Sequence, residues 1–331
     1  MRPIVVLGAG SWGTALAIQF ARGGERTVLW GRAEDHPEEL ARARENAHYL
    51  PGAKFPPALV IEPDLARALA QGDDVVLVVP SSVLRTVLQQ IKPQLTPKAR
   101  VAWASKGFEL STGKLPHQVA REVLGPGVPI AVLSGPTFAK EVGQGLPTAI
   151  AVASSDEEFA RSLAERISSG GFRAYTQTDI VGVEIGGAVK NVLAIATGCS
   201  DGLGYGSNSR VFLITRGLAE LMRLGVALGA KRETLMGLAG LGDLVLTCTD
   251  DQSRNRRFGR ALAAGKPVAQ AIAEIGQVVE GYHAAKAVHE VAQKHGVDMP
   301  ICRHVYEVLH QGVPIDQVVS GMLARAVTPE N

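Results

Sequence analysis

The sequence lacks any excess of charge of one sign. Lysine and arginine number 34 against 32 for aspartate and glutamate, so the formal net charge is only +2. A balance this close excludes a chain whose overall field attracts nucleic acid or an anionic membrane surface. We therefore expect no nucleic-acid partner, and any bound anion must be held by a few local groups.

Cysteine is scarce, and long apolar runs are missing. Cys199, Cys248 and Cys302 are far apart and show no metal-ligand spacing, which argues against disulfides and a metal site and fits a reducing compartment. The opening "MRPIVVLGAG" turns to glycine after a few apolar residues, unlike a secretory signal. No segment reaches the ~18 uninterrupted apolar residues of a membrane span. The sequence thus predicts a soluble cytoplasmic protein without stable membrane insertion.

With 331 residues, 46% of them hydrophobic, the chain is long enough for about two domains. Up to about residue 176, short β-branched runs alternate with helical patterns, and runs such as "VVLVV" indicate strands covered on both faces. The expected strands lie at 4–8, 27–31, 74–80, 100–105, 129–135, 148–154 and 172–176.

After Thr178 only helical patterns follow, at 179–200, 208–228, 232–246, 255–264, 268–275, 281–295, 301–311 and 315–325. The sequence therefore predicts an α/β chain in two parts. Residues 1–178 would form a Rossmann-like doubly wound sheet that binds a dinucleotide, and residues 179–331 an all-α domain.

A glycine pattern follows the first expected strand. Gly8, Gly10 and Gly13 stand in GxGxxG spacing directly before a helical pattern. In that context the glycines allow a tight turn and a close approach of pyrophosphate to the helix N-terminus. We therefore expect a dinucleotide site here.

The second expected strand ends without the acidic residue that usually binds the ribose 2′-hydroxyl. Gly31 stands in its place and Arg32 follows, so a guanidinium could meet a 2′-phosphate. Glu34 and Asp35 lie close enough to bind a ribose instead. The expected cofactor is therefore NADP or NAD, with the preference open.

A lysine stands inside the apolar helical stretch 184–198. Gly186, Gly187, Ala194 and Thr197 share the face of Lys190 at helical spacing. On one interpretation the lysine stem covers apolar neighbours while the ammonium reaches water. On the other, the charge points into a cleft where the glycines leave room for a ligand.

Polar residues cluster in four further stretches where packing alone gives no reason for them: "SKGF" (105–108), "SGPTFAKEV" (134–142), "LGDL" (241–244) and "SRNRRFG" (253–259). Ser253 is the expected N-cap of a helix that begins with Arg254 and Asn255. A capped helix start with an arginine is a ready phosphate site. A nucleic-acid patch is disfavoured because no interleaved aromatics accompany it.

These stretches together resemble bacterial-type NAD(P)-dependent glycerol-3-phosphate dehydrogenase. The resemblance covers nearly the whole chain, with the following motifs in the family's order: "GAGSWGTALA", "SKGFE", "SGPTFAKEV", "VGVEIGGAVKNVLAIATG", "AGLGDLVLTCT", "SRNRRFG" and "VVEGY". It implies reversible hydride transfer between NAD(P)H and dihydroxyacetone phosphate, giving sn-glycerol 3-phosphate for phospholipid synthesis.

The resemblance also implies roles for particular residues. Lys190 would be the catalytic acid/base group. The substrate would be bound by Lys106, Gly135, Thr137, Lys190, Asp243, Ser253, Arg254 and Asn255. The coenzyme would be bound by Gly8, Gly10, Ser11, Trp12, Gly13, Arg32, Lys106, Ala139, Arg254, Val278 and Glu280.

Two alternatives stay open at this point. One is another reductase with the same two-part fold, of the 3-hydroxyacid or ketopantoate type, although such substrates lack the phosphate that "SRNRR" suits. The other is a dinucleotide sensor without catalysis, which would not need Lys190, Lys106 and Asp243 together. Whether the chain forms a homodimer also stays open.

Overall fold

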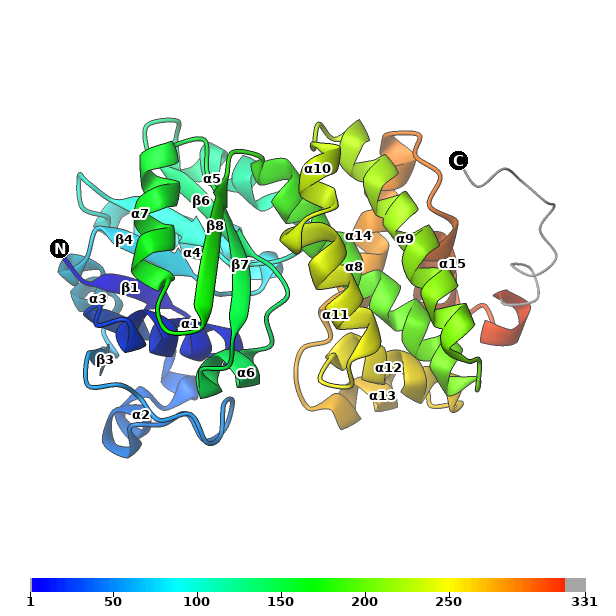
Figure 1. Cartoon of the computed structure of the whole chain (residues 1–331), viewed down its shortest axis with the longest axis horizontal. Helices are drawn as coiled ribbons and strands as arrows, with labels where there is room; N and C mark the ends of the chain where they lie inside the picture. Colours follow the sequence, from blue (N-terminus) through cyan, green and yellow to red (C-terminus); the bar gives the residue numbers. More distant parts are fainter. Residues whose placement is uncertain (1, 319–331) are drawn as a thin grey trace.

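The computed structural model describes residues 2–318, which form a sheet half and a helical half side by side (Figure 1). One eight-stranded sheet has the order β3-β2-β1-β4-β5-β6-β7-β8. Its strands are β1 (Ile4–Leu7), β2 (Thr27–Trp30), β3 (Leu59–Ile61), β4 (Asp74–Leu77), β5 (Arg100–Trp103), β6 (Ile130–Ser134), β7 (Thr148–Ala153) and β8 (Phe172–Gln177). The predicted Rossmann-like sheet is confirmed.

Helices lie on both faces of the sheet, and each face has its own apolar core. They are α1 (Ser11–Arg22), α2 (Pro37–Ala43), α3 (Leu65–Gln71), α4 (Leu84–Ile91), α5 (Pro116–Leu124), α6 (Ala139–Gln144) and α7 (Glu157–Ile167). Because helices cover both faces, strands such as β1 and β4 are buried at every position.

Two features of the sheet differ from the sequence prediction. β3 was not predicted, because three residues at the sheet edge are too few for a periodic signal. β7 pairs with β6 in the antiparallel direction, whereas the other neighbouring pairs are parallel. β7 and β8 therefore run opposite to the first six strands of the sheet, so the chain does not enter β7 by a right-handed βαβ crossover.

The helical half is built around one long helix, α8 (Ile180–Gly202). The others are α9 (Ser207–Ala227), α10 (Arg232–Leu235), α11 (Asp243–Thr249), α12 (Arg254–Ala263), α13 (Val268–Ile275), α14 (Glu280–Lys294) and α15 (Pro300–His310). Of the predicted helix at 315–325, residues 315–318 are helical and the rest lies outside the described residues. The predicted all-helical half is confirmed.

α8 is long and apolar enough to cross a membrane by length and composition alone. The sequence showed no membrane span here because Glu184, Lys190 and Asn191 interrupt the apolar run of this helix. Within the fold, 89% of its apolar window is buried. The helix therefore serves as the core of this half, against which the neighbouring helices pack.

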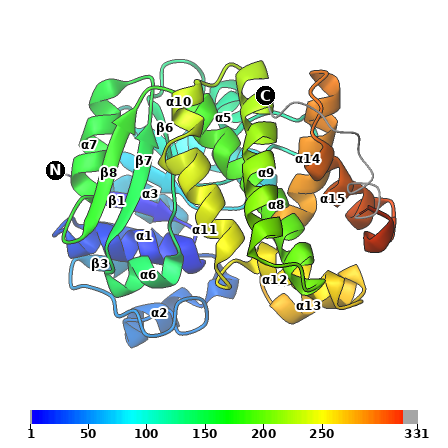
Figure 2. The ribbon, with the colours of Figure 1, turned by 45° about the vertical axis from the view of Figure 1, so that its right-hand side comes forward.

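The predicted continuous helix over 232–246 is wrong. The chain forms the short α10, then a π-helical turn (Leu238–Gly242), and then α11. Glycine makes the break possible: a Cβ at Gly240 would lie 1.9 Å from the Leu235 carbonyl oxygen. Figures 1 and 2 show α11 lying between β7 and α9, where the two halves meet.

Candidate active site

The glycine loop joins β1 to α1 in the predicted place. Gly8 has φ +118°, a conformation that favours glycine. Its Cβ would lie 2.4 Å from the Val78 carbonyl oxygen, and a Cβ at Gly13 would lie 1.9 Å from the Gly8 oxygen. α1 then begins at Ser11, and its N-cap Gly10 supplies no side-chain cap. The first turn of α1 is thus left to bind an anion.

The end of β2 explains the missing acidic residue. A Cβ at Gly31 would lie 2.7 Å from the Cβ of Ala9, so a larger residue would push β2 away from the glycine loop. Asp35 is turned inward, and its Oδ2 accepts a hydrogen bond from the Arg32 backbone N–H at 2.8 Å. The Arg32 side chain is 63% exposed, and its Nη1 lies 3.0 Å from Glu34 Oε2. Arg32 and Glu34 are therefore the exposed charges beside this strand end.

Three charged groups predicted separately meet where the two halves join. Lys190 of α8 donates through Nζ to Asp243 Oδ1 at 2.5 Å, and Lys106, after β5, donates to Asp243 Oδ2 at 2.6 Å. Thr247, one turn after Asp243 on α11, accepts from Lys190 Nζ at 3.0 Å. The Asp243 carboxylate therefore holds both ammonium groups at one place.

Burial decides between the two interpretations of Lys190. The residue is only 8% exposed, so its ammonium is not extended into bulk water. The adjacent glycines Gly186 and Gly187 were expected to leave room for a ligand, but other parts of the protein fill the space beside them. A Cβ at Gly186 would lie 2.0 Å from the Ala239 oxygen of the π turn, and one at Gly187 3.2 Å from the Lys106 stem. The glycines thus let the π turn and Lys106 approach α8.

Burial lowers the pKa of Lys190 from 10.5 to about 8. Asp243 acts in the opposite direction and raises this pKa, while the positive charge of Lys106 lowers it. A lysine with this pKa exchanges its proton near neutral pH, which an unperturbed lysine does not. The cluster therefore has the chemistry of an acid/base group.

Glu184, six residues before Lys190 on α8, fixes this helix against the sheet half. Its Oε1 accepts from Trp103 Nε1 at 3.0 Å and from the His117 backbone N–H at 2.9 Å. Burial raises the pKa of Glu184. Because Trp103 is the last residue of β5 and Lys106 follows soon after, this contact sets the position of α8 relative to Lys106.

The start of α12 has the form that the sequence predicts. Ser253 is the N-cap, and its Oγ accepts from the Arg256 backbone N–H at 3.2 Å. Asn255 is buried and accepts from the Gly281 backbone N–H at 2.9 Å. Arg254 is partly exposed and donates to Gln277 at 3.3 Å. Backbone N–H groups and one partly exposed guanidinium thus gather at this helix start.

Arg256 differs from Arg254 in being buried and paired. Its Nη2 donates to Asp201 at 2.6 Å, and its Nη1 donates to Asp251. These carboxylates neutralise Arg256 and fix the start of α12 against the end of α8. Arg254 donates instead to the neutral amide of Gln277, so its guanidinium stays available to an anion.

The remaining predicted residues lie around these two centres. Gly135 and Thr137 follow β6, where Thr137 Oγ1 donates to the Gly135 oxygen at 3.3 Å, and Ala139 begins α6. Val278 is 53% exposed just before α14. Glu280 begins α14 and accepts from Asn191 at 3.0 Å. Which of them touch a ligand stays a prediction.

Sequence reasoning did not single out Thr247 as a contact of Lys190, although its spacing of four residues from Asp243 puts both on one helix face. Asn191, next to Lys190 on α8, was also not among the predicted site residues. The structure ties Asn191 to Glu280. Among residues 2–318, no group of three or more His, Cys, Asp and Glu side chains could hold a metal ion.

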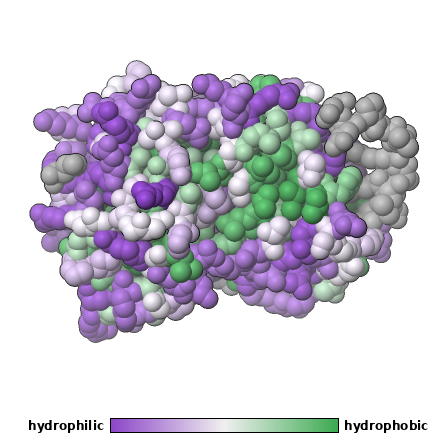
Figure 3. Space-filling model, in the orientation of Figure 1, coloured by the Kyte–Doolittle hydropathy of each residue, from purple (hydrophilic) through white to green (hydrophobic). Residues whose placement is uncertain are grey.

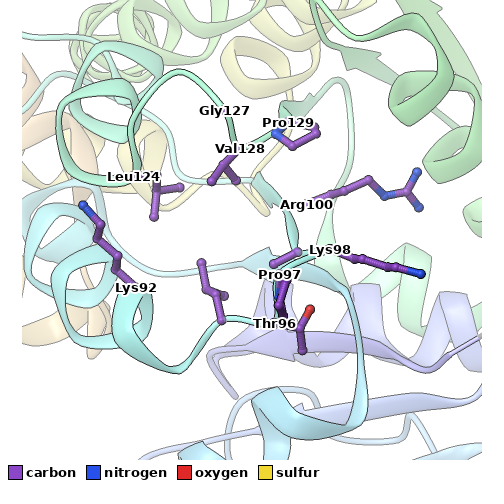
Figure 4. A pocket seen from close by; sticks show the side chains of 11 residues that line it. Lys92, Thr96, Pro97, Lys98, Arg100, Leu124, Gly127, Val128 and Pro129 are labelled. Carbon is purple, nitrogen blue, oxygen red and sulfur yellow. The ribbon is translucent and has the colours of Figure 1, made fainter.

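A recess of about 480 Å³ lies elsewhere, at the beginning of β5 and β6. Figure 4 shows that its two lysines, Lys92 and Lys98, point in different directions instead of toward one another. Arg100, which also lines it, donates to Asp74 at 2.6 Å. This recess has no converging polar groups and does not compete with the lysine cluster as a site.

Family models for the two parts of NAD-dependent glycerol-3-phosphate dehydrogenase match this chain, the N-terminal model at residues 3–160 and the C-terminal model at residues 179–320. The glycerol-3-phosphate dehydrogenase (NAD(P)+) of Methylococcus capsulatus is 55% identical, covering 99% of this chain and 98% of its own. The corresponding protein of Aeromonas salmonicida is 56% identical, covering 97% of both.

Solved structures of the same family have the same fold. A crystal structure of glycerol-3-phosphate dehydrogenase from Coxiella burnetii is 48% identical with a TM-score of 0.94, covering 98% of this chain and 99% of its own. A ketopantoate reductase from Ralstonia eutropha is 17% identical with a TM-score of 0.60, covering 96% of this chain and 100% of its own. The likeness to the ketopantoate reductase shows a shared fold alone.

Proposed function

The chain belongs to the NAD-dependent glycerol-3-phosphate dehydrogenase family, and we propose that Lys190 is the acid/base residue of its reaction. The enzyme is an oxidoreductase that interconverts sn-glycerol 3-phosphate and dihydroxyacetone phosphate with NAD or NADP. The observation that carries the proposal is the buried carboxylate of Asp243 shared by Lys190 and Lys106.

The residues at the glycine loop fit a dinucleotide. Gly8 and Gly13 are positions where a Cβ would collide with backbone, so the loop folds tightly enough for a phosphate to approach. The first turn of α1 has no side-chain cap and can donate N–H groups to a pyrophosphate. Ser11 and Trp12 begin this turn. When bound there, the nicotinamide coenzyme supplies or accepts the hydride.

Lys190 and Lys106 would act on the substrate oxygen. In the reducing direction, negative charge grows on the carbonyl oxygen, where protonated Lys190 can stabilise it and deliver a proton. In the oxidising direction, neutral Lys190 can remove the hydroxyl proton. A lysine with a pKa of about 8 is populated in both forms near neutral pH, which suits a reversible reaction.

Asp243 would position the two lysines and keep a counter-charge beside them. Its carboxylate is almost fully buried, at 1% exposure, and contacts one ammonium on each oxygen. Without it, two positive charges would repel each other in a site with little water. Thr247 supports the same geometry through its hydrogen bond with Lys190.

The start of α12 would bind the phosphate of the substrate. Ser253 caps the helix start and Asn255 lies in its first turn. Arg254 adds a guanidinium that donates to the neutral amide of Gln277 and so keeps its positive charge available to a phosphate. Gly135 and Thr137 would contact the substrate from the sheet half. On the coenzyme side, Ala139, Val278, Glu280 and Arg254 would join the glycine loop.

Reduction of dihydroxyacetone phosphate tests the proposed function. Purified protein should oxidise NADH or NADPH with dihydroxyacetone phosphate and stay inactive with ketopantoate and with acetoacetyl thioesters. Turnover of only a substrate without phosphate would support the alternative reductase. Binding of coenzyme without turnover of any of these substrates would support the dinucleotide sensor.

In the cell, we place the enzyme in the cytoplasm, where it would supply glycerol phosphate for phospholipid synthesis. Three cysteines without disulfide partners support a reducing compartment. The enzyme would act as a homodimer, because apolar side chains such as Val211, Phe212 and Val245 are exposed, and Figure 3 shows a hydrophobic area over α9 and α11. Light scattering at several protein concentrations would give the mass.

A further inference from the structure

A buried amide contacts the glycine loop from a distant part of the chain. Asn46 lies in the irregular segment between α2 and β3 and is only 1% exposed. Its Nδ2 donates to the Ala9 carbonyl oxygen at 2.8 Å and to Thr14 Oγ1 at 2.9 Å. Its Oδ1 accepts from the Tyr49 backbone N–H at 3.1 Å. The side chain is therefore oriented by three hydrogen bonds.

The contact with Ala9 fixes the direction of one peptide group. The carbonyl of Ala9 and the N–H of Gly10 belong to the same peptide, and in a trans peptide they point in opposite directions. Among residues 2–318 no peptide bond is cis. Because the carbonyl points inward to Asn46, the Gly10 N–H points outward. The space beside Gly10 is open, since a Cβ there would meet no atom within 4 Å.

We propose that Asn46 is a positioning residue for the coenzyme: it holds the Ala9 carbonyl inward and so directs the Gly10 N–H toward the pyrophosphate. The inference rests on the proposed function, which puts a dinucleotide at this loop. It adds a residue to the coenzyme site that does not itself touch the coenzyme.

The glycine loop needs such a restraint because of its own composition. Rotation of the peptide between Ala9 and Gly10 changes ψ of Ala9 and φ of Gly10, and glycine tolerates almost any φ. The residue that admits the pyrophosphate therefore also lets this peptide turn over. Thr14 Oγ1 donates to the same carbonyl at 3.3 Å, a longer contact than that of Asn46. Asn46 is thus the shorter of the two restraints.

The segment that carries Asn46 is itself packed against α6, the helix that follows β6. Leu50 and Ala53 are both buried and lie against α6, where a Cβ at Gly143 would lie 2.9 Å from Leu50 and 3.1 Å from Ala53. Glu45 accepts from the Gly52 backbone N–H at 2.8 Å and closes the segment. Asn46 therefore donates from a segment that is held by its own hydrogen bond and by packing against α6.

Binding of two coenzyme fragments separates a positioning role from a purely structural one. ADP-ribose contains the pyrophosphate and adenosine does not. Asn46→Ala and Asn46→Asp both remove the donor to Ala9, and the aspartate keeps the size of the side chain. Asn208→Ala, an exposed asparagine on α9, is the matched control.

In both Asn46 variants we expect the Kd of ADP-ribose to rise about tenfold, on the scale of one lost hydrogen bond. The Kd of adenosine and the KM of dihydroxyacetone phosphate should stay within about twofold. An equal loss of affinity for ADP-ribose and adenosine would overturn the proposal. So would lower thermal stability with an unchanged Kd of ADP-ribose. If the Asn46 variants do not fold, Thr14→Val decides: it should weaken ADP-ribose about threefold and leave adenosine unchanged.

These outcomes are separate from the test of the proposed function. If the unaltered protein fails to reduce dihydroxyacetone phosphate yet loses ADP-ribose affinity on mutation of Asn46, the enzyme assignment fails and the positioning role holds. If turnover is normal and ADP-ribose affinity does not respond, the positioning role fails alone.

Discussion

Lys190 Nζ and Asp243 Oδ1 lie 2.5 Å apart, although 53 residues separate them in the chain. Lys106 occupies the other oxygen of the same carboxylate at 2.6 Å. α8 brings Lys190 to this point, the π turn before α11 brings Asp243, and the loop after β5 brings Lys106. One carboxylate thus joins groups from both halves of the molecule.

Asp243→Asn should lower kcat by about 100-fold, the scale of losing control of an acid/base group. The amide keeps the shape of the side chain but removes the negative charge, so the two ammonium groups repel and the pKa of Lys190 falls further. Steady-state kinetics with dihydroxyacetone phosphate measures the effect. Asp298→Asn, at an exposed carboxylate, is the control and should leave kcat unchanged. Full turnover in Asp243→Asn would remove this carboxylate from the chemistry.

The rate should depend on pH in opposite ways for the two directions. Reduction needs protonated Lys190, so its kcat should fall as pH rises through about 8, whereas oxidation should gain rate over the same range. Lys190→Arg keeps a group that stays protonated, and oxidation should lose its rise at high pH. Profiles of both directions without a change near pH 8 would contradict the assignment.

The same pKa has a consequence for stability. Folding lowers the pKa of Lys190 from 10.5 to about 8, so between these values the unfolded chain binds more protons than the folded one. Stability from this group therefore rises with pH across that window and is least below about 8. Lys190→Met should flatten that part of the pH profile of the unfolding free energy, measured with urea.

The alternation of short β-branched runs with helical patterns, followed by helical patterns alone, was enough to predict the two-part fold. Seven of the strands were predicted from such short runs, and the long helices, α8 above all, from apolar patterns over many residues. The failures came where the chain is short or irregular. β3 has three residues at the sheet edge, and the stretch 232–246 is broken by a π turn. The packing of Gly186 against Ala239, a tertiary contact, accompanies that turn.

The members of the site could be named from motifs, but not their geometry. Lys190, Lys106 and Asp243 were predicted from separate stretches, and only the fold puts one carboxylate between both lysines. The burial of Lys190 is also set by tertiary packing. Asn46 could not be predicted as a contact of the glycine loop, because Ala9 and Thr14 are 37 and 32 residues away from it in the chain.

Arg254→Ala should raise the KM for dihydroxyacetone phosphate at least about tenfold, because a guanidinium that binds phosphate is lost. Arg257→Ala is the matched control, since Arg257 is exposed on the same helix. Activity with dihydroxyacetone, which lacks the phosphate, should respond far less to Arg254→Ala. Equal KM changes in the two arginine variants would contradict a phosphate contact at Arg254.

Arg32 should influence the choice of coenzyme. Its side chain is 63% exposed beside the end of β2, where the guanidinium can turn toward a 2′-phosphate. Arg32→Ala should lower kcat/KM for NADPH about tenfold and change that for NADH by less than about threefold. Arg67→Ala, another exposed arginine paired with an acid, serves as the control. An equal decrease of kcat/KM for NADPH and NADH would exclude the 2′-phosphate contact.

The start of α12 depends on close packing against α8, which Gly259→Ala should disturb. A Cβ at Gly259 would lie 2.2 Å from the Ile195 carbonyl oxygen, a backbone atom that cannot rotate away. We expect a loss of about 1–3 kcal/mol in unfolding free energy, and a higher KM for dihydroxyacetone phosphate, since α12 carries Ser253 and Arg254 at its start. Thermal unfolding and steady-state kinetics measure the two effects. Gly127→Ala should change neither, because a Cβ there meets no atom within 4 Å.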